Sequence, residues 1–438
     1  MQPEQPTSLR TFLILWIGQM TSILGSEMTN FAITIWAWQI AGQATPLSLI
    51  FFFTYTPKLI AASFAGLLVD RWNRKQLMMG GDTAAGLSTI AILLLLLTGR
   101  LEIWHFYITA AINGLFGYIQ SLAFSASMSA IVPPRHYTRA TAMSSYVTYF
   151  GSYIMAPALA GALYYAIGLS GILAIDLVTF VVAVGTTCTV RIPQPRPSEV
   201  GRQSTQSIWQ ALTFGFRYLR KRPSLLAILI FWLSFHLFDG ATLAIFPAMV
   251  LAGSNNDAAV LASVQFAIGI GGLVGATGLS VWGGPKRRIH GLLFGTALMS
   301  LGKIIFGLGR VAWHWMTAGF LAAFVSPAID SSNQAIWLAK VEPDVQGRVF
   351  ASRYLIAQMT TPLGLAIAGP LADYFFEPAM LPGGSIAGIF GSLFGTGNGA
   401  GMALQYSLFS CCSMLIGFGG YAFPVLRDVE SLVPDHHS

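Results

Sequence analysis

The chain has 438 residues, of which 54% are hydrophobic and only 9% are charged. Soluble globular proteins carry about 25% charged residues, so this composition excludes an ordinary water-soluble protein. The formal net charge is +7, from 24 basic and 17 acidic residues.

Long apolar runs recur between charged, Gly or Pro breaks. A helix needs about 20 mostly apolar residues to cross a bilayer, so the chain has room for about twelve spans. The unbroken apolar run from Ile90 to Leu97 excludes a membrane β-barrel, whose strands alternate apolar and polar residues. The expected spans are 11–37, 46–69, 77–98, 104–128, 140–165 and 168–190, then 224–250, 257–282, 289–309, 313–337, 349–372 and 401–426.

The predicted fold is therefore an all-α polytopic membrane protein with two six-helix bundles, residues 1–190 and 223–438. A cytoplasmic linker of residues 191–222 joins them, and it opens with the Pro-rich segment IPQPRPSEV. Its second part predicts an amphipathic helix on the membrane surface, with a soluble linker helix as the alternative. Its apolar residues at helical spacing are Ile208, Leu212, Phe216 and Leu219.

The basic residues are divided unequally between the two sides of the membrane. With both termini inside, the outer loops hold only Arg100 and Arg310. Because positive loops stay on the cytoplasmic side, we expect a multi-pass inner-membrane protein with both termini cytoplasmic. The polar first ten residues lack the features of a removable signal peptide. The net charge is thus an orientation signal and predicts no nucleic-acid binding.

The two halves contain related segments. At an offset of 212 residues, Gly66 to Lys75 (GLLVDRWNRK) aligns with Gly278 to Arg287 (GLSVWGGPKR). At an offset of 209, Val132 aligns with Val341, and a proline and an arginine in each half follow in register. Internal repeats are common in secondary transporters, whose substrate site lies near the bilayer midplane between the repeats.

The first of these segments resembles the signature loop between helices two and three of the major facilitator superfamily. The wider pattern resembles its drug:proton antiporter branch, which includes macrolide-efflux and enterobactin-exporter proteins. The likeness implies that the loop gates transport, and Asn73 replaces a glycine there because Asn tolerates a left-handed backbone. An acidic residue that makes a contact in one conformation only would act as a latch. The expected gating residues are Gly66, Asp70, Arg71, Arg74 and Lys75.

A second antiporter signature, in helix five, is present in relaxed form as APALAG, with Pro157 and Gly161. The arginine that many drug antiporters carry in helix four is missing, because the chain reads AINGLFGYIQ there. The usual proton relay of that family is therefore not expected in its standard form.

Charged side chains inside a membrane cost at least about 2.5 kcal/mol each and need a reason. Glu27 and Asp239 stand at equivalent places in the halves, since the 212-residue offset relates them. We predict that both carry protons, with His236 one turn before Asp239 as a relay partner. The alternative is that each carboxylate pairs with a lysine, Lys58 for Glu27 and Lys303 for Asp239.

Polar residues of other predicted spans share helix faces with aromatic ones. Such mixed faces suit a cavity for an amphipathic ligand, although hydrogen bonding between helices is an equal alternative. Asp82 is expected to pair with the basic signature loop, and Asp176 suggests no role. The cavity candidates are Asn30, Asn113, Gln120, Asp330, Asn333, Gln334 and Trp337.

The glycines between Asp373 and Gly401 predict an outer loop, with a short apolar re-entrant segment from Ile386 to Phe394. The sequence contains no catalytic constellation, phosphate-binding glycine loop or metal-ligand spacing, so no enzyme activity, metal or cofactor is expected. The three cysteines lie in apolar runs and predict packing, not disulfides.

The expected function is proton-coupled efflux of amphipathic drugs or macrolide-like compounds by alternating access. The expected partners are the small-molecule substrate, protons and membrane lipids, and a monomer is predicted. An exporter of one secondary metabolite or siderophore is an alternative. A receptor or lipid-handling scaffold that transports nothing is another.

Overall fold

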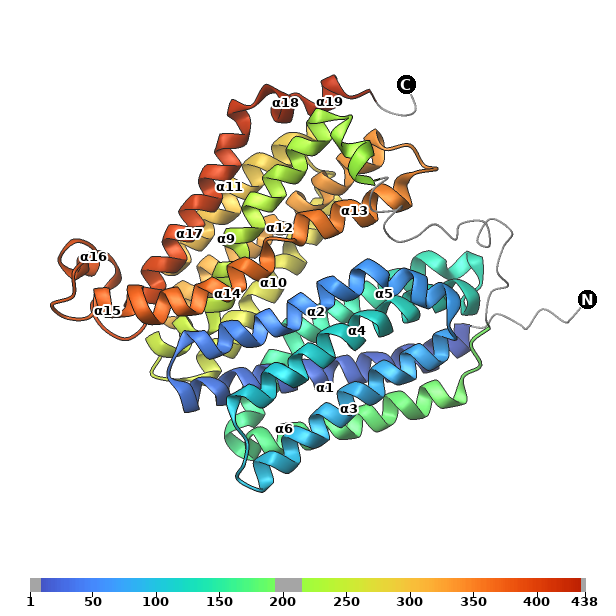
Figure 1. Ribbon diagram of the computed structural model, residues 1–438, viewed down its shortest axis with the longest axis horizontal. Coiled ribbons are helices and arrows are strands. Elements are labelled where there is room, and N and C mark those ends of the chain that lie inside the picture. The colour runs from blue at the N-terminus through green and yellow to red at the C-terminus, as the bar shows by residue number, and fades with distance from the viewer. Residues whose placement is uncertain (1–8, 194–214, 435–438) are drawn as a thin grey trace, which may run out of the picture. The chain divides into compact units, whose positions relative to one another are not determined.

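The structure is a computed structural model that describes residues 9–193 and 215–434. Every regular element in these ranges is a helix (Figure 1). The contacts divide the chain into two compact units: unit 1 is Met1–Trp36 with Phe53–Ile208, and unit 2 is Ala37–Phe52 with Trp209–Ser438. The predicted linker helix falls largely on residues 194–214, which lie outside the described ranges.

Four long helices open the chain, and a longer interrupted helical run follows them. The boundaries match the predicted spans to within a few residues. The elements are α1 (Leu9–Ala41), α2 (Ala44–Arg71), α3 (Arg74–Leu97), α4 (Ile103–Ile131), η1 (Pro134–His136), α5 (Tyr137–Phe150), η2 (Gly151–Met155) and α6 (Ala156–Thr189).

The run through α6 is broken once, at Gly168. Its φ of 61° and ψ of −170° are not helical, and L-residues with a side chain rarely adopt such a positive φ. The break falls where the sequence predicts one span to end, at residue 165, and the next to begin, at 168. Glycine therefore divides this continuous apolar stretch into two helical segments.

The second half also opens with four long helices, and the shorter helices that follow them are accompanied by the 20-residue helix α17 near the end of the chain. The elements are α9 (Pro223–Gly253), α10 (Ala258–Trp282), α11 (Arg288–Gly307), α12 (Ala312–Lys340), α13 (Gln346–Gln358), α14 (Thr361–Leu371), η3 (Ala372–Phe376), α15 (Glu377–Met380), α16 (Ala387–Phe394), α17 (Ala400–Gly419), η4 (Gly420–Ala422), α18 (Pro424–Arg427) and α19 (Val429–Leu432).

The prediction of a loop from Asp373 onward is wrong at its start. The helical run continues through the π-turn η3 and α15 to Met380. Pro378 is compatible with this because it lies in the first turn of α15, where its missing N–H costs little. Farther along, the glycine-rich stretch contains one short helix, α16, over residues 387–394, where the sequence predicts the short apolar segment from Ile386 to Phe394.

Eight helical segments of the described chain are long and apolar enough to cross a membrane. Helices α1, α4 and α12 have 33, 29 and 29 residues but are not among the eight. These three helices carry most of the predicted polar site residues. Large apolar side chains within the long apolar helices, for example Val181 of α6 and Leu415 of α17, are each 65% exposed, as surface that faces lipid should be.

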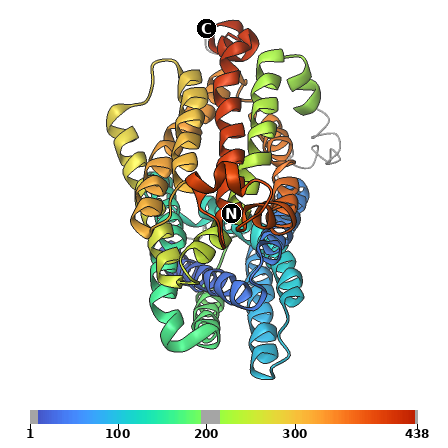
Figure 2. The same ribbon diagram turned by 90° about the vertical axis from the view of Figure 1, so that its left-hand side faces the viewer.

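Within each unit, glycines allow close packing. In unit 1, α3 lies beside α4 and α6, and in unit 2, α11 lies between α12 and α17 (Figures 1 and 2). A Cβ atom on Gly271 or Gly275 of α10 would lie 2.3 or 2.1 Å from a backbone oxygen of α12. This pair of small residues, one turn apart, is how membrane helices bring their backbones together.

Candidate functional site

The signature loop joins α2 to α3, and Asn73 caps the N-terminus of α3. The Asn73 side chain accepts hydrogen bonds from two amides of the first turn of α3, and its φ of −66° is an ordinary one. The expectation that Asn replaces glycine for its tolerance of a left-handed backbone is therefore wrong; Asn is favoured here as an N-cap. Arg74 Nη1 donates to the Ala126 carbonyl of α4 at 2.7 Å. Lys75 Nζ donates to two carbonyls near the end of α6, at 2.8 and 2.9 Å.

The other gating candidates lie at the exposed end of α2. Gly66, Asp70 and Arg71 are all solvent-exposed. A Cβ atom on Gly66 would meet nothing within 4 Å. In this structure Gly66 is therefore not required for packing.

The corresponding loop of unit 2 makes a matching contact. Arg288 Nη1, at the start of α11, donates to the Ala335 carbonyl of α12 at 3.1 Å. Ala335 stands 209 residues after Ala126, the offset that also aligns Val132 with Val341. Gly283 ends α10 with a φ of 83°. An arginine thus joins α3 to α4 in unit 1 and α11 to α12 in unit 2.

Glu27 lies on α1 in unit 1, next to exposed Asn30. Asn30 Nδ2 donates to Glu27 Oε2 at 3.3 Å. Lys58 of α2 and Tyr153 of η2 lie near enough to interact electrostatically with the Glu27 carboxylate. Lys58 Nζ lies 5.6 Å from the ring centroid of Tyr55. Glu27 makes no ion pair within 4 Å with any residue that the structure describes, so the predicted Lys58 pair is not formed here.

Asp82 is the centre of a buried polar cluster between helices of unit 1. Gln19 of α1 and Gln120 of α4 donate to its two oxygens at 3.0 and 2.8 Å. The expectation that Asp82 pairs with the basic signature loop is wrong, because Arg74 and Lys75 turn to backbone carbonyls instead. Gln120, predicted to line a cavity, is thus engaged between helices.

Asp176 of α6 has a similar environment. Thr89 Oγ1 of α3 donates to Asp176 Oδ2 at 2.7 Å, and Ser26 Oγ of α1 donates to Oδ1 at 3.2 Å. Asp176 is only 5% exposed. Its role in the described structure is to join α1, α3 and α6 through hydrogen bonds.

Asp239 of α9 forms an ion pair with Lys303 of α11. Lys303 Nζ also lies 3.4 Å from Thr242 Oγ1. His236 stacks on Trp232, with ring centroids 4.9 Å apart, and lies within electrostatic range of Asp239. The lysine pairing that the sequence left as an alternative is thus present for Asp239. Asp239 and Glu27 belong to different units.

The predicted face of α12 separates into exposed and buried residues. Trp337 is fully buried, and its Nε1 donates to Asn333 Oδ1 at 3.1 Å. Gln334 is exposed and accepts a hydrogen bond from Arg353 Nη1 of α13 at 3.1 Å. Asp330 is exposed and within electrostatic range of Arg353. Arg353 is not among the site residues predicted from the sequence, where it is one of the basic residues that indicate the cytoplasmic side.

The remaining candidates lie on α4 and α6. Asn113 is exposed on α4. Pro157 and Gly161 are buried at the start of α6, immediately after the π-turn η2. The antiporter signature therefore occupies a packed position.

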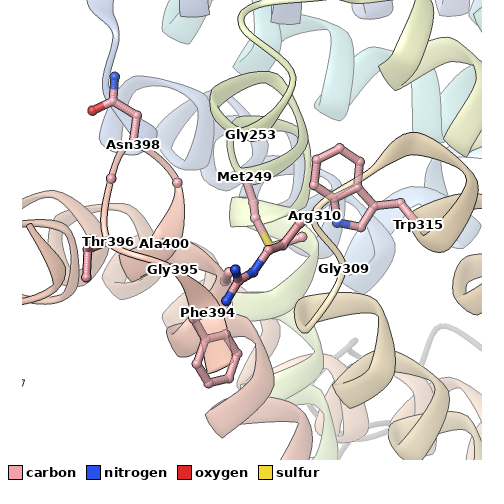
Figure 3. Close-up of a pocket in the computed structure, with 13 residues that line it drawn as sticks. Met249, Gly253, Gly309, Arg310, Trp315, Phe394, Gly395, Thr396, Asn398 and Ala400 are labelled. Atoms are coloured by element: carbon pink, nitrogen blue, oxygen red, sulfur yellow. The ribbon is translucent and has the colours of Figure 1, made fainter. Parts of the chain in front are cut away.

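A pocket in unit 2 contains none of the predicted site residues (Figure 3). Its volume is about 220 Å³, and the Gly-rich segment 395–399 forms one wall. Arg310 Nη2 donates to the carbonyls of Ser392 and Leu393 at 3.0 and 2.7 Å. At this volume the pocket is smaller than the roughly 300–1,000 Å³ of drug-binding sites.

A charged cluster joins the loop after α12 to the segment before α9. Tyr218 donates to one oxygen of Glu342, and Arg222 Nη2 donates to the other at 2.6 Å. The Tyr218 hydrogen bond and the Arg222 charge lower the pKa of Glu342, with Tyr218 the larger cause. Burial and the neighbouring carboxylate raise the pKa of Tyr218. This cluster fixes the beginning of α9.

Long helices with apolar outer surfaces, and with hydrogen-bonded carboxylates between them, define a multi-pass membrane protein. Comparison with known sequences gives the family. Residues 15–364 match the sequence profile of the Major Facilitator Superfamily, so the chain belongs to this family of transporters. The family predicted from the signature loop is confirmed.

The relatives support the predicted branch at low identity. Macrolide efflux protein A of Streptococcus pyogenes is 25% identical over 364 residues, which cover 83% of this chain and 89% of that protein. Multidrug efflux pump Tap of Mycolicibacterium fortuitum is 24% identical over 378 residues, covering 82% and 89%.

Solved structures share the fold. The nucleoside transporter NupG (D323A mutant) has a TM-score of 0.68 at 13% identity, covering 93% of this chain and 98% of that chain. A bacterial homologue of the iron transporter ferroportin, in an inward-facing state, has a TM-score of 0.64 at 14% identity, covering 94% and 98%.

Proposed function

We propose that this transporter exports amphipathic compounds in exchange for protons, by alternating access between two six-helix bundles. The names of two relatives, a macrolide efflux protein and a multidrug efflux pump, support export of such compounds. The bundles would be residues 1–190 and 223–438 with twelve spans, joined by the linker 191–222. The break at Gly168 and the matching arginine contacts of the two loops support this plan.

The observation that carries proton coupling is the setting of Glu27. Its carboxylate lies beside exposed Asn30 and has Lys58 and Tyr153 in electrostatic range, without an ion pair to a described residue. A carboxylate inside a membrane helix that is not neutralised by a close cation has a strong tendency to bind a proton. Asp239 differs, because Lys303 already neutralises it. We therefore assign the exchanged proton to Glu27 and a supporting role to Asp239.

Substrate would bind near the exposed polar residues of α1, α4 and α12. The cavity candidates with exposed side chains are Asn30, Asn113, Asp330 and Gln334. Three further candidates would stabilise the helices that carry these side chains. Gln120 bonds to Asp82 of another helix, and Trp337 bonds to Asn333. Gating is proposed for Asp70 and Arg71, which are exposed at the end of α2.

The proposed setting is the inner membrane, with both termini cytoplasmic and a single chain as the working unit. The experiment is transport by inverted vesicles with and without an imposed pH gradient. Macrolide accumulation that needs the gradient in wild type and is insensitive to it in Glu27→Gln is the expected result. Glu102→Gln is the matched control, because Glu102 lies at the exposed N-terminus of α4. Gradient-driven transport by Glu27→Gln would remove the assignment.

A further inference from the structure

Asp373 caps the N-terminus of α2. Its carboxylate accepts hydrogen bonds from the backbone amides of Ala44 and Thr45 at 2.8 and 2.7 Å, and from the Thr45 hydroxyl. A helix N-terminus carries about half a positive charge, so a carboxylate there is stabilising. Residues 37–52, which form the end of α1, the turn after it and the start of α2, belong to unit 2 by their contacts, whereas the rest of these two helices belongs to unit 1.

The same place is closely packed. A Cβ atom on Gly369 of α14 would lie 2.5 Å from the Thr45 Cα and 2.2 Å from Ser48 Oγ. Ala44, Leu47 and Ser48 are at most 1% exposed. Glycine at 369 therefore allows the α2 terminus to approach near enough for Asp373 to cap it.

A second contact holds the end of α1. Trp38 Nε1 donates to Asn256 Oδ1 at 2.6 Å, in the turn between α9 and α10. Asn256 has a φ of 67°, a conformation that asparagine tolerates better than most residues. Both ends of the short connection between α1 and α2 are thus hydrogen-bonded to other parts of unit 2.

The chain offers a comparison four residues away. Glu377 accepts from the amides of Gly399 and Met402 at 3.1 and 2.7 Å and so caps α17. This cap joins neighbouring helices of one proposed bundle, which need not separate during transport. Asp373 instead bonds to a helix of the other proposed bundle.

We propose that Asp373 is the latch that closes the outer side of the transporter. The proposal rests on the proposed function, because alternating access requires residues 37–52 to leave unit 2 when the outer side opens. Under the proposed topology this connection faces outward. Hydrogen bonds to a carboxylate suit such a latch, because water can replace them when the contact opens.

The first test measures the contact without transport. Hydrogen exchange followed by mass spectrometry on the purified protein should show the amides of residues 44 and 45 exchanging about tenfold faster in Asp373→Asn than in wild type. Glu377→Gln should leave these amides unchanged and speed exchange at residues 399–402. Unchanged protection at 44–45 in a folded Asp373→Asn protein overturns the latch.

The second test measures opening in intact cells. In a protein whose three native cysteines are replaced, a cysteine at Asn30 should react faster with an impermeant thiol reagent in Asp373→Asn than in wild type, and not in Glu377→Gln. Equal reaction in the Asp373→Asn and Glu377→Gln backgrounds overturns the proposal.

A covalent latch that keeps Asp373 covers the case in which Asp373→Asn fails to fold. Trp38→Cys with Asn256→Cys, in the protein whose native cysteines are replaced and joined through disulfides by a bifunctional methanethiosulfonate reagent, should lose transport and regain it on reduction. Normal transport by the cross-linked protein also overturns the latch. If wild type transports none of the tested compounds, the exchange and labelling results still decide on the latch, while the proposed function fails separately.

Discussion

Replacing Asp239 with Asn tests whether an ion pair holds α9 to α11. The side chains of Asp239 and Lys303 retain 30% and 20% exposure, so the pair is mostly but not wholly removed from solvent. Removing one partner of a buried pair costs about 3–5 kcal/mol, and the remaining exposure favours the lower figure. Among the described residues, the Lys303 ammonium would then keep the Thr242 hydroxyl, at 3.4 Å, as its only hydrogen-bond partner.

At about 2 °C per kcal/mol, a loss of about 3 kcal/mol lowers the melting temperature by about 6 °C. The assay is thermal unfolding of the purified protein, followed by scanning fluorimetry. Adding Lys303→Met to Asp239→Asn should recover most of the loss, because no buried charge then remains. Glu27→Gln is the control and should melt as wild type does. A stable Asp239→Asn protein, or a double variant no better than the single one, would refute the structural pair.

Three further predictions concern packing, pH and topology. Gly364→Ala should destabilise the protein by about 1–3 kcal/mol, because the added Cβ atom would lie 2.1 Å from the Leu237 carbonyl oxygen. Gly66→Ala is the control and should not destabilise the protein, because its Cβ atom would meet nothing within 4 Å. Thermal unfolding of the two purified variants compares them. The pKa of Glu342 is lowered in the folded protein, so the Glu342 carboxylate stabilises the fold at pH values above its ordinary pKa of 4.5. This stabilisation is lost as the pH falls through the lower pKa of the folded state. The melting temperatures of wild type and Glu342→Gln should therefore converge on acidification. In intact cells, a cysteine at 100 should react with an impermeant reagent and one at 287 should not; the reverse pattern would invert the topology.

The sequence predicts the helices well because their boundaries follow from local chemistry. Gly168 interrupts an apolar stretch by adopting a positive φ, and the loop before Lys75 is polar and charged. The end of the helix through Asp373 was misplaced for a reason that is not local. Contacts with α2 and α17 satisfy Asp373 and Glu377, and these partners are distant in sequence.

Side-chain partners were harder to predict than helix positions. Spacing places Gln120 and Asn113 on one face of α4, yet Gln120 turns to Asp82 and Gln19 between helices. Periodicity gives the face of a helix but not the neighbour that the face meets. The alternative that Asp239 pairs with Lys303 can be read from the sequence, because charges at membrane depth have few possible partners.

The π-turns η2 and η3 have a consequence for sequence alignment and protein engineering. A π-turn holds one more residue than an α-turn, so each marks the place of a single-residue insertion in an otherwise regular helix. Deleting one residue from 372–376 would restore a continuous α-helix and rotate everything beyond it by about 100°. Glu377 would then turn away from the amides of α17. A gap at this place in an alignment with a relative therefore signals a different helical phase, and a deletion there is a larger change than any single substitution nearby.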